Sequence, residues 1–169
     1  MPTGFVSVDG SGVEAAPDMS DIDSPETYIG YNRAQSFVSP GGEAPDTPRL
    51  YTAAVPELNE WALSGNWTVG GQQAVLNEDD GGITYRFHAR DLNLVFGTVA
   101  ENKPVRFCVT VDGMPPGANH GADDDAKGDG VVTGQRLYQL IRQTGAVEDH
   151  TFTIKFLDPG VQAYSFTFG

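Results

Sequence analysis

The chain has 169 residues, which is long enough for one domain that buries its own core. It contains 23 acidic and 10 basic residues, and the formal net charge of −13 repels nucleic acids and anionic membranes, so we expect neither as a partner. Cys108 is the single cysteine, which excludes an internal disulfide and a Cys-x-x-Cys redox pair. No apolar run approaches the roughly 18 residues of a membrane span, and no signal peptide is recognisable.

Acidic residues and prolines dominate the first part of the chain. Residues 1–60 hold ten acidic and two basic residues, and six prolines interrupt the stretch between residues 17 and 56. This composition predicts an irregular acidic segment that leads into or wraps a domain. Within it, Ser24-Pro25-Glu26 has the cap, first-position proline and first-turn acid of a helix start, so a short helix or turn is predicted near residues 25–34.

From about residue 50 onward, apolar and polar residues alternate with a period of two, as in strands with one buried face. The alternation is strongest in 83–90, 105–112, 151–156 and 164–168. Weaker strand candidates are 50–53, 61–69, 74–77, 92–96, 131–133 and 136–142. Turn signals separate these segments, and the pattern predicts an all-β protein, an antiparallel two-sheet sandwich of the jelly-roll kind.

Basic residues are concentrated on the predicted strands. By alternation, most of them share polar faces with His88, and they include Arg86, Arg90, Arg106, Arg136 and Arg142. If the strands are neighbours, an acidic protein presents one cationic face, and guanidinium groups suit carboxylates and sugar hydroxyls. The simpler alternative is that these arginines pair with acidic residues across the strands.

Aromatic residues offer a second candidate surface. Trp61 and Trp67 lie six residues apart with Leu63 and Val69 on the same side, a stripe that favours the core over an exposed sugar platform. Tyr138 lies in a strand with poor alternation and is the better candidate for an exposed ring.

The acidic loop between Gly113 and Gly130 is a candidate calcium site. Asp123, Asp125 and Asp129 supply carboxylates among flexible glycines, although the spacing is not that of an EF-hand. The alternative is a solvated acidic hairpin loop. No other cofactor is indicated.

No catalytic motif stands out. The sequence has no Gly-x-Ser-x-Gly elbow and no His-Glu-x-x-His metal spacing, and a single cysteine on a strand is more often inert than reactive. We therefore expect a non-enzymatic domain.

Several blocks in order resemble the C-terminal domain of DipZ-type thioredoxin-like proteins. They are SPETYIGY (24–31), WALSGNWTV (61–69), YRFHARDL (85–92), PPGANHG (115–121), RLYQLIR (136–142) and FLDPGVQAYSFTFG (156–169). The resemblance implies a jelly roll similar to a carbohydrate-binding module, placed after a thioredoxin-like domain in a periplasmic or extracytoplasmic protein. It also divides the chain into a linker over residues 1–23 and a domain over residues 24–169. The absence of Cys-x-x-Cys means that thiol–disulfide chemistry cannot be carried over to this chain.

The combined prediction is a non-catalytic module that binds sugars or cell-envelope glycans and accompanies a thioredoxin-like redox domain. Its ligand-binding candidates are Arg86, His88, Arg90, Arg106, Tyr138 and Arg142. The alternative function is a protein-interaction or structural module that docks the redox domain or its substrates.

Overall fold

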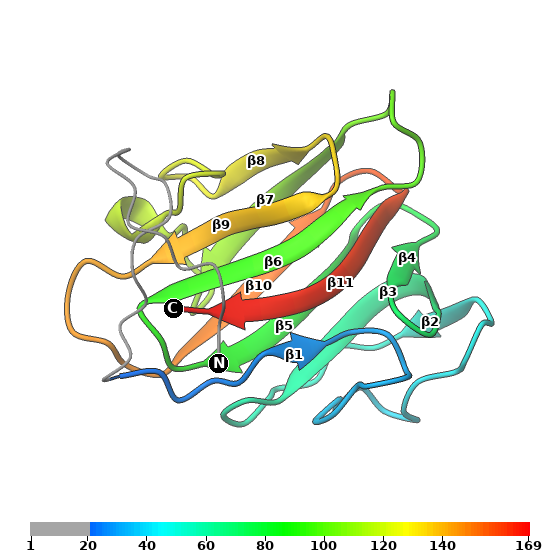
Figure 1. The fold of residues 1–169 in the computed structure, drawn as a ribbon, viewed down its shortest axis with the longest axis horizontal. Helices are drawn as coiled ribbons and strands as arrows, with labels where there is room; N and C mark the ends of the chain where they lie inside the picture. Colours follow the sequence, from blue (N-terminus) through cyan, green and yellow to red (C-terminus); the bar gives the residue numbers. More distant parts are fainter. Residues whose placement is uncertain (1–20) are drawn as a thin grey trace.

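The computed structural model describes residues 21–169, and the regular secondary structure of these residues is almost entirely β-strand (Figure 1). The strands are β1 (Thr27–Tyr28), β2 (Arg49–Tyr51), β3 (Trp61–Val69), β4 (Ala74–Leu76), β5 (Gly81–Phe87), β6 (Asp91–Thr98), β7 (Val105–Val111), β8 (Asp129–Val132), β9 (Arg136–Arg142), β10 (His150–Phe156) and β11 (Val161–Phe168). One short 3-10 helix, η1 (Gly117–Asn119), lies between β7 and β8. The all-β prediction is confirmed.

The strands form one curled antiparallel sheet. Their order is β8-β7-β10-β5-β3-β4-β11-β6-β9, with β1 added beside β11 and β2 beside β3. Sequence neighbours are often not sheet neighbours: β11, the last strand, lies between β4 and β6. Strand β11 therefore joins β4 to β6 within the sheet, and Figure 1 shows it in red across the front.

Strand β3 is the joint at which the sheet curls. Its first half, Trp61 to Ser64, pairs with β5, and its second half, Trp67 to Val69, pairs with β4. Between the halves, Gly65 has a φ of +94°, a backbone conformation that residues with a Cβ rarely adopt. This glycine lets a single strand serve two arms of the sheet, the β5 arm (β8, β7, β10, β5) and the β6 arm (β4, β11, β6, β9).

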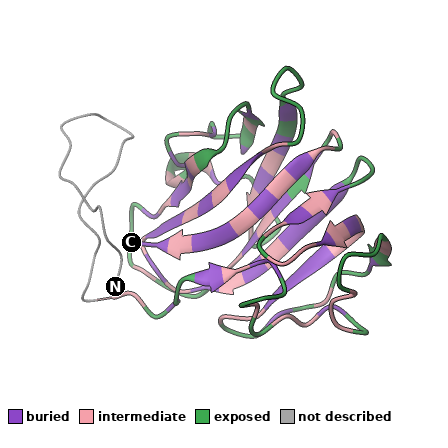
Figure 2. Ribbon diagram, turned by 45° about the vertical axis from the view of Figure 1, so that its right-hand side comes forward, coloured by how far each residue is buried: buried purple, intermediate pink, exposed green. Residues whose placement is uncertain are grey.

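Aromatic rings fill the space between the two arms. The ring centroids of Trp67 and Phe156 are 6.0 Å apart, and those of Tyr85 and Phe166 are 4.9 Å apart. Trp61 and Trp67 are both fully buried, which confirms that the tryptophan stripe belongs to the core. Along the strands, buried residues alternate with partly exposed ones, while exposed residues gather in the loops (Figure 2).

The N-terminal segment follows the surface of this sheet. Residues 27–28 form β1 and residues 31–33 form a turn, so the turn predicted near residues 25–34 is confirmed and the helix is wrong. The helix does not form because the backbone of Thr27 and Tyr28 pairs with β11, opposite Phe166 and Ser165. Of the predicted linker, residues 1–20 lie outside the described residues. Among residues 21–169 no helix is long and apolar enough to cross a membrane.

Candidate functional site

A polar pocket of about 290 Å³ lies where β6 begins and β9 ends, on the outer side of the β6 arm. It is lined by Asp91, Asn93, His120, Gly121, Ala122, Gln139, Ile141 and Arg142. The antiparallel register brings the walls together, because Asp91 lies opposite Arg142 and Asn93 lies opposite Gln139. A β-bulge between Leu92 and Asn93 shifts this register at the pocket itself.

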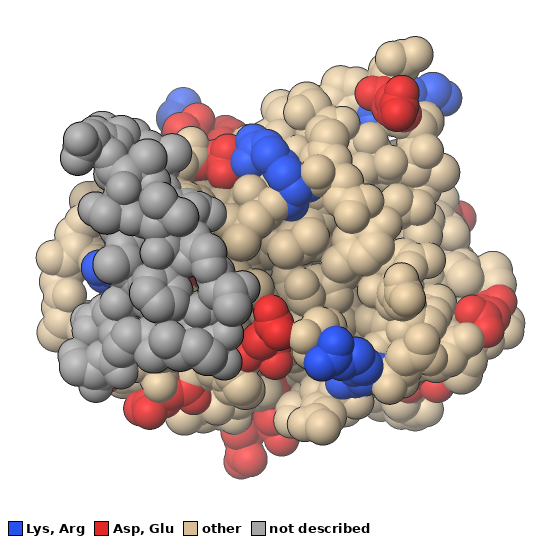
Figure 3. Space-filling view, in the orientation of Figure 1, with Lys and Arg blue, Asp and Glu red and all other residues tan. Residues whose placement is uncertain are grey.

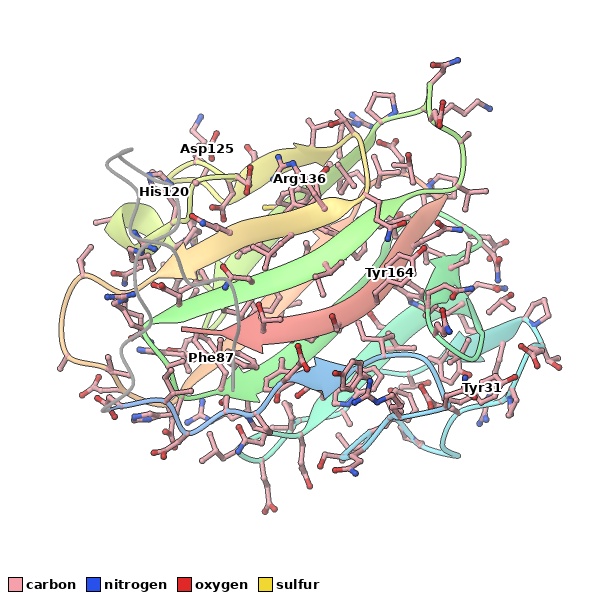
Figure 4. The ribbon with its side chains drawn as sticks, viewed as in Figure 1. Tyr31, Phe87, His120, Asp125, Arg136 and Tyr164 are labelled. Carbon is pink, nitrogen blue, oxygen red and sulfur yellow. The ribbon has the colours of Figure 1, made fainter. Side chains whose placement is uncertain are left out.

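The loop that carries η1 forms the third wall of the pocket. The Gly121 amide donates to the carbonyl of Leu140 at 2.9 Å, and the Asp123 amide donates to that of Gln139 at 3.0 Å. A Cβ at Gly121 would lie 2.1 Å from the Gln139 carbonyl oxygen, so only glycine permits this approach. The loop is thus fastened along the free edge of β9. Figure 4 shows His120 beside this end of the sheet, with Arg136 at the opposite end of β9.

Asp91 anchors the charged side of the pocket. The residue is only 5% exposed, and its carboxylate accepts a bidentate pair of hydrogen bonds from each of two arginines. Arg142 donates from Nε to Oδ1 at 3.0 Å and from Nη2 to Oδ2 at 3.2 Å. Arg90 donates from Nε to Oδ1 at 3.1 Å and from Nη2 to Oδ2 at 2.9 Å. One negative charge therefore meets two positive charges.

The remaining polar lining is uncharged. Asn93 and Gln139 each carry an amide with donors and an acceptor. The His120 Nδ1 lies 2.7 Å from the carbonyl oxygen of Gly121, so this nitrogen is the donor and Nε2 is the acceptor in the neutral ring. Ala122 and Ile141 add apolar surface. None of the lining residues is a serine, threonine or cysteine, so the pocket offers hydrogen bonds rather than a hydroxyl or thiol nucleophile.

The predicted arginine face is not formed. Arg106 makes a two-pronged ion pair with Asp158, with Nη2 2.8 Å from Oδ1, and Arg86 donates to Thr151 and lies 3.8 Å from Asp112. These two arginines lie on the β5 arm, whereas Arg90 and Arg142 meet at Asp91. The expectation of one cationic surface was wrong, because each of these side chains pairs with an aspartate, as in the simpler alternative.

Tyr138 is the second correction. It is fully buried, and its ring packs edge-on against Phe96 with centroids 4.5 Å apart. Its hydroxyl donates to the Gly134 carbonyl at 2.6 Å. Tyr138 lies opposite Leu94, so it shares the inward side of the β6 arm, and an exposed stacking ring is excluded at this position.

Two of the three predicted calcium ligands, Asp123 and Asp125, have protein partners. Asp123 forms a bidentate ion pair with Arg136, whose Nη2 lies 2.8 Å from Oδ1. The Asp125 carboxylate accepts hydrogen bonds from the backbone amides of Lys127 and Asp129 at 2.9 and 3.0 Å. The calcium site stays a prediction. The most buried acid of this loop is Asp124, which the sequence did not single out, and burial raises its pKa to about 8.

Two further candidates lie away from the pocket lining. His88, directly after β5, sits between the carboxylates of Asp21 and Asp149, which raise its pKa. Burial and the neighbouring Asp129 raise the pKa of the Cys108 thiol, which disfavours the reactive thiolate.

Among the pocket residues that sequence reasoning missed are Asn93 and Gln139. Each is a polar residue between two apolar ones on a strand, which marks an outward-facing position. That signal was present, but nothing local in the sequence says that these two strands are neighbours.

Comparison with known proteins agrees with the resemblance seen in the sequence. The family model described as "Thioredoxin like C-terminal domain" matches residues 24–169. The chain is also 29% identical over 154 residues to Protein DipZ of Mycobacterium bovis and of Mycobacterium tuberculosis. That match covers 86% of this chain but only 18% of each relative, so the chain spans less than a fifth of their length. With most of its length inside the family model, the chain belongs to the thioredoxin-like C-terminal domain family.

Proposed function

We propose that this domain is a non-catalytic binding module for carbohydrate, with the pocket between β6 and β9 as its ligand site. The supporting observation is the chemistry of the lining: two amides and an imidazole carry both donors and acceptors, which suits the hydroxyl groups of a sugar. The Arg142 guanidinium beside them, held in place by Asp91, adds a partner for a carboxylate. A neutral or weakly acidic glycan fits this set best.

The sheet surface that continues from the pocket strands toward β11 supports the same proposal. Beyond the residues drawn in grey, the front of the molecule over β11 and the later part of β6 consists mainly of uncharged residues between a few separate basic and acidic groups (Figure 3). Tyr164, labelled in Figure 4, lies on β11 and is partly exposed. A largely uncharged surface with a partly exposed tyrosine can extend contact with a longer glycan chain.

We further propose that the curled sheet is a jelly-roll sandwich of the carbohydrate-binding-module kind. The aromatic contacts between the two arms support this assignment, because facing sheets of a sandwich interdigitate in this way. In a longer protein, the domain would accompany a thioredoxin-like domain in an extracytoplasmic location. Redox chemistry would then belong to that other domain, since this chain has a single cysteine.

A protein-docking role is the second candidate, and one observation favours it. In β2 and the segment that follows it, Leu50, Val55 and Leu58 are 73%, 96% and 41% exposed within nine residues. Apolar side chains gathered in one exposed segment are typical of protein interfaces. This segment, rather than the polar pocket, would meet the redox domain or its substrates.

A glycan array followed by calorimetry distinguishes the carbohydrate-binding function from the protein-docking function. We expect the chain to retain at least one glycan, and the double variant Asn93→Ala, Gln139→Ala to weaken binding by about tenfold or more, because each lost hydrogen bond contributes on the order of 1 kcal/mol. The control is Lys155→Ala, which changes an exposed residue on the β5 arm and leaves affinity unchanged. Failure to retain any glycan at millimolar concentration, or equal binding by the double variant, would contradict the proposal.

A further inference from the structure

The carboxylates around His88 form the densest cluster of potential metal ligands in residues 21–169. The nearest ligand atoms of Asp21, Asp23 and His88 all lie within 4.8 Å of one another. His88 Nε2 is 2.7 Å from Asp21 Oδ1 and 3.8 Å from Asp23 Oδ2. One imidazole nitrogen therefore faces two carboxylates, which is a donor set that suits a divalent transition-metal ion.

The other imidazole nitrogen is also held. His88 Nδ1 lies 2.7 Å from Asp149 Oδ1, in the segment that leads into β10. When Nδ1 donates its proton to Asp149, Nε2 is the nitrogen left to bind a metal. A carboxylate behind the ring is the partner that metal-binding histidines in proteins usually have, because it fixes the ring and makes Nε2 a stronger ligand.

The backbone brings the two aspartates to this histidine. The Asp23 amide donates to the His88 carbonyl at 2.9 Å, and the His88 amide donates to Ser24 Oγ at 2.8 Å. The Asn59 side chain also donates to the Asp23 carbonyl at 2.8 Å. Ile22, between the two aspartates, packs against the core. These hydrogen bonds hold the backbone of the cluster in place at the end of β5, where Figure 4 labels Phe87.

Charge favours a cation at this point. Asp21, Asp23 and Asp149 place three carboxylates around one ring, so the cluster remains negative even when His88 is protonated. The histidine side chain is 16% exposed, while those of Asp21 and Asp23 are 41% and 68% exposed, so the aspartates can adjust their positions. Tetrahedral coordination separates two ligand atoms by about 3.3 Å, so Asp21 must move outward by only a few tenths of an ångström.

We propose that Asp21, Asp23 and His88 bind a divalent metal ion of the zinc class, with Asp149 as the group that positions the imidazole. The metal replaces the proton on Nε2, which is released to solvent. With three protein ligands, a water molecule completes a tetrahedral site. Metal binding would fasten residues 21–24 to the end of β5 and stabilise the folded chain, because the ligands come together only in the folded state.

The test is titration of the untagged, metal-free 169-residue chain with zinc chloride by calorimetry, and with cobalt chloride by visible absorption. We expect one equivalent to bind and the melting temperature to rise. His88→Gln and the double variant Asp21→Asn, Asp23→Asn should abolish binding, and the latter changes only partly exposed side chains. Asp149→Asn should weaken it by about 10- to 100-fold.

His150→Gln is the matched control, because His150 also contacts an aspartate, with Nδ1 2.6 Å from Asp112 Oδ2, and belongs to no metal cluster within the described residues. This variant should bind zinc as the parent chain does. Absence of zinc binding, or binding that survives His88→Gln, would show that the cluster is an ion pair of protonated His88 with its aspartates and would overturn the proposal. Unchanged affinity in Asp149→Asn would overturn the role given to Asp149.

Discussion

Asp91 is the residue on which the geometry of the pocket depends. It joins the start of β6 to the end of β9 through Arg142, and to the preceding turn through Arg90. A buried carboxylate needs such partners, because the cost of removing it from water is recovered only through close ion pairs and hydrogen bonds.

We predict that Asp91→Asn lowers the free energy of unfolding by roughly 2–3 kcal/mol, because two guanidinium groups lose their shared counter-charge. Chemical denaturation measures this change. The control is Asp158→Asn, whose partner Arg106 is largely exposed, so its loss should be much smaller. Equal losses in the two variants would show that Asp91 is not the anchor.

Cys108 should be a slow nucleophile. Burial and the acidic groups of Asp129, Asp125 and Asp124 raise its pKa, so the thiolate fraction at pH 8 is below that of a free cysteine. We expect iodoacetamide to alkylate it several-fold more slowly than free cysteine, and Asp129→Asn to increase the rate. Alkylation as fast as that of the free amino acid would contradict the raised pKa.

Glu43 should make stability depend on pH. Burial raises its pKa from 4.5 to about 7, and one carboxylate oxygen has no hydrogen-bond partner. Because the folded-state pKa exceeds the unfolded one, Glu43 contributes stability below about pH 4.5 that is lost as the pH rises through 7. Glu43→Gln should therefore be more stable than the parent chain at pH 8, by on the order of 1 kcal/mol since the group is only half-buried, and not at pH 4. Denaturation curves at the two pH values test this, and an equal change at both would contradict it.

At the scale of elements, β3 decides how the sheet curls. Sequence alternation correctly predicted a strand over 61–69, and the tryptophan stripe correctly predicted a buried side. It could not predict that the strand changes partners midway, because that depends on the conformation of Gly65 and on the approach of Gly81 from β5.

We predict that Gly65→Ala costs about 2 kcal/mol or more in the free energy of unfolding. A Cβ there would lie 2.7 Å from the Gly81 Cα, and φ is +94°. Gly145→Ala, a position with open space and no positive φ, is the matched control and should change stability little. Equal stability of Gly65→Ala and the parent chain would remove Gly65 as the structural reason for the curl.

At the scale of the whole molecule, the sequence indicated the fold class but not the site. Local alternation identifies strands and their inward faces, and this sufficed for the all-β prediction. The pocket depends on which strands are neighbours, and β6 and β9 are joined in space across a connection of 37 residues, from 99 to 135. The same limit explains Tyr138: its strand was recognised, but its inward side is fixed by pairing with Leu94.

The arginines illustrate the same limit through charge. Basic residues on the predicted strands suggested one cationic surface, but the curled sheet distributes them over its two arms and the turn between β5 and β6. Acidic residues from loops and strand ends then come to meet them, as Asp158 meets Arg106. Pairing of this kind is a long-range property of the fold, so a count of charges along the chain cannot reveal it.

The most direct test of the central claim is a ¹H–¹⁵N NMR titration of the chain with the glycan that it retains best on an array. If the pocket is the ligand site, the amide signals that shift most will be those of Asp91, Asn93, Gly121 and Gln139, where β6, β9 and the η1 loop meet. Shifts concentrated on residues 50–58 instead would contradict the account and identify the exposed apolar segment as the binding surface.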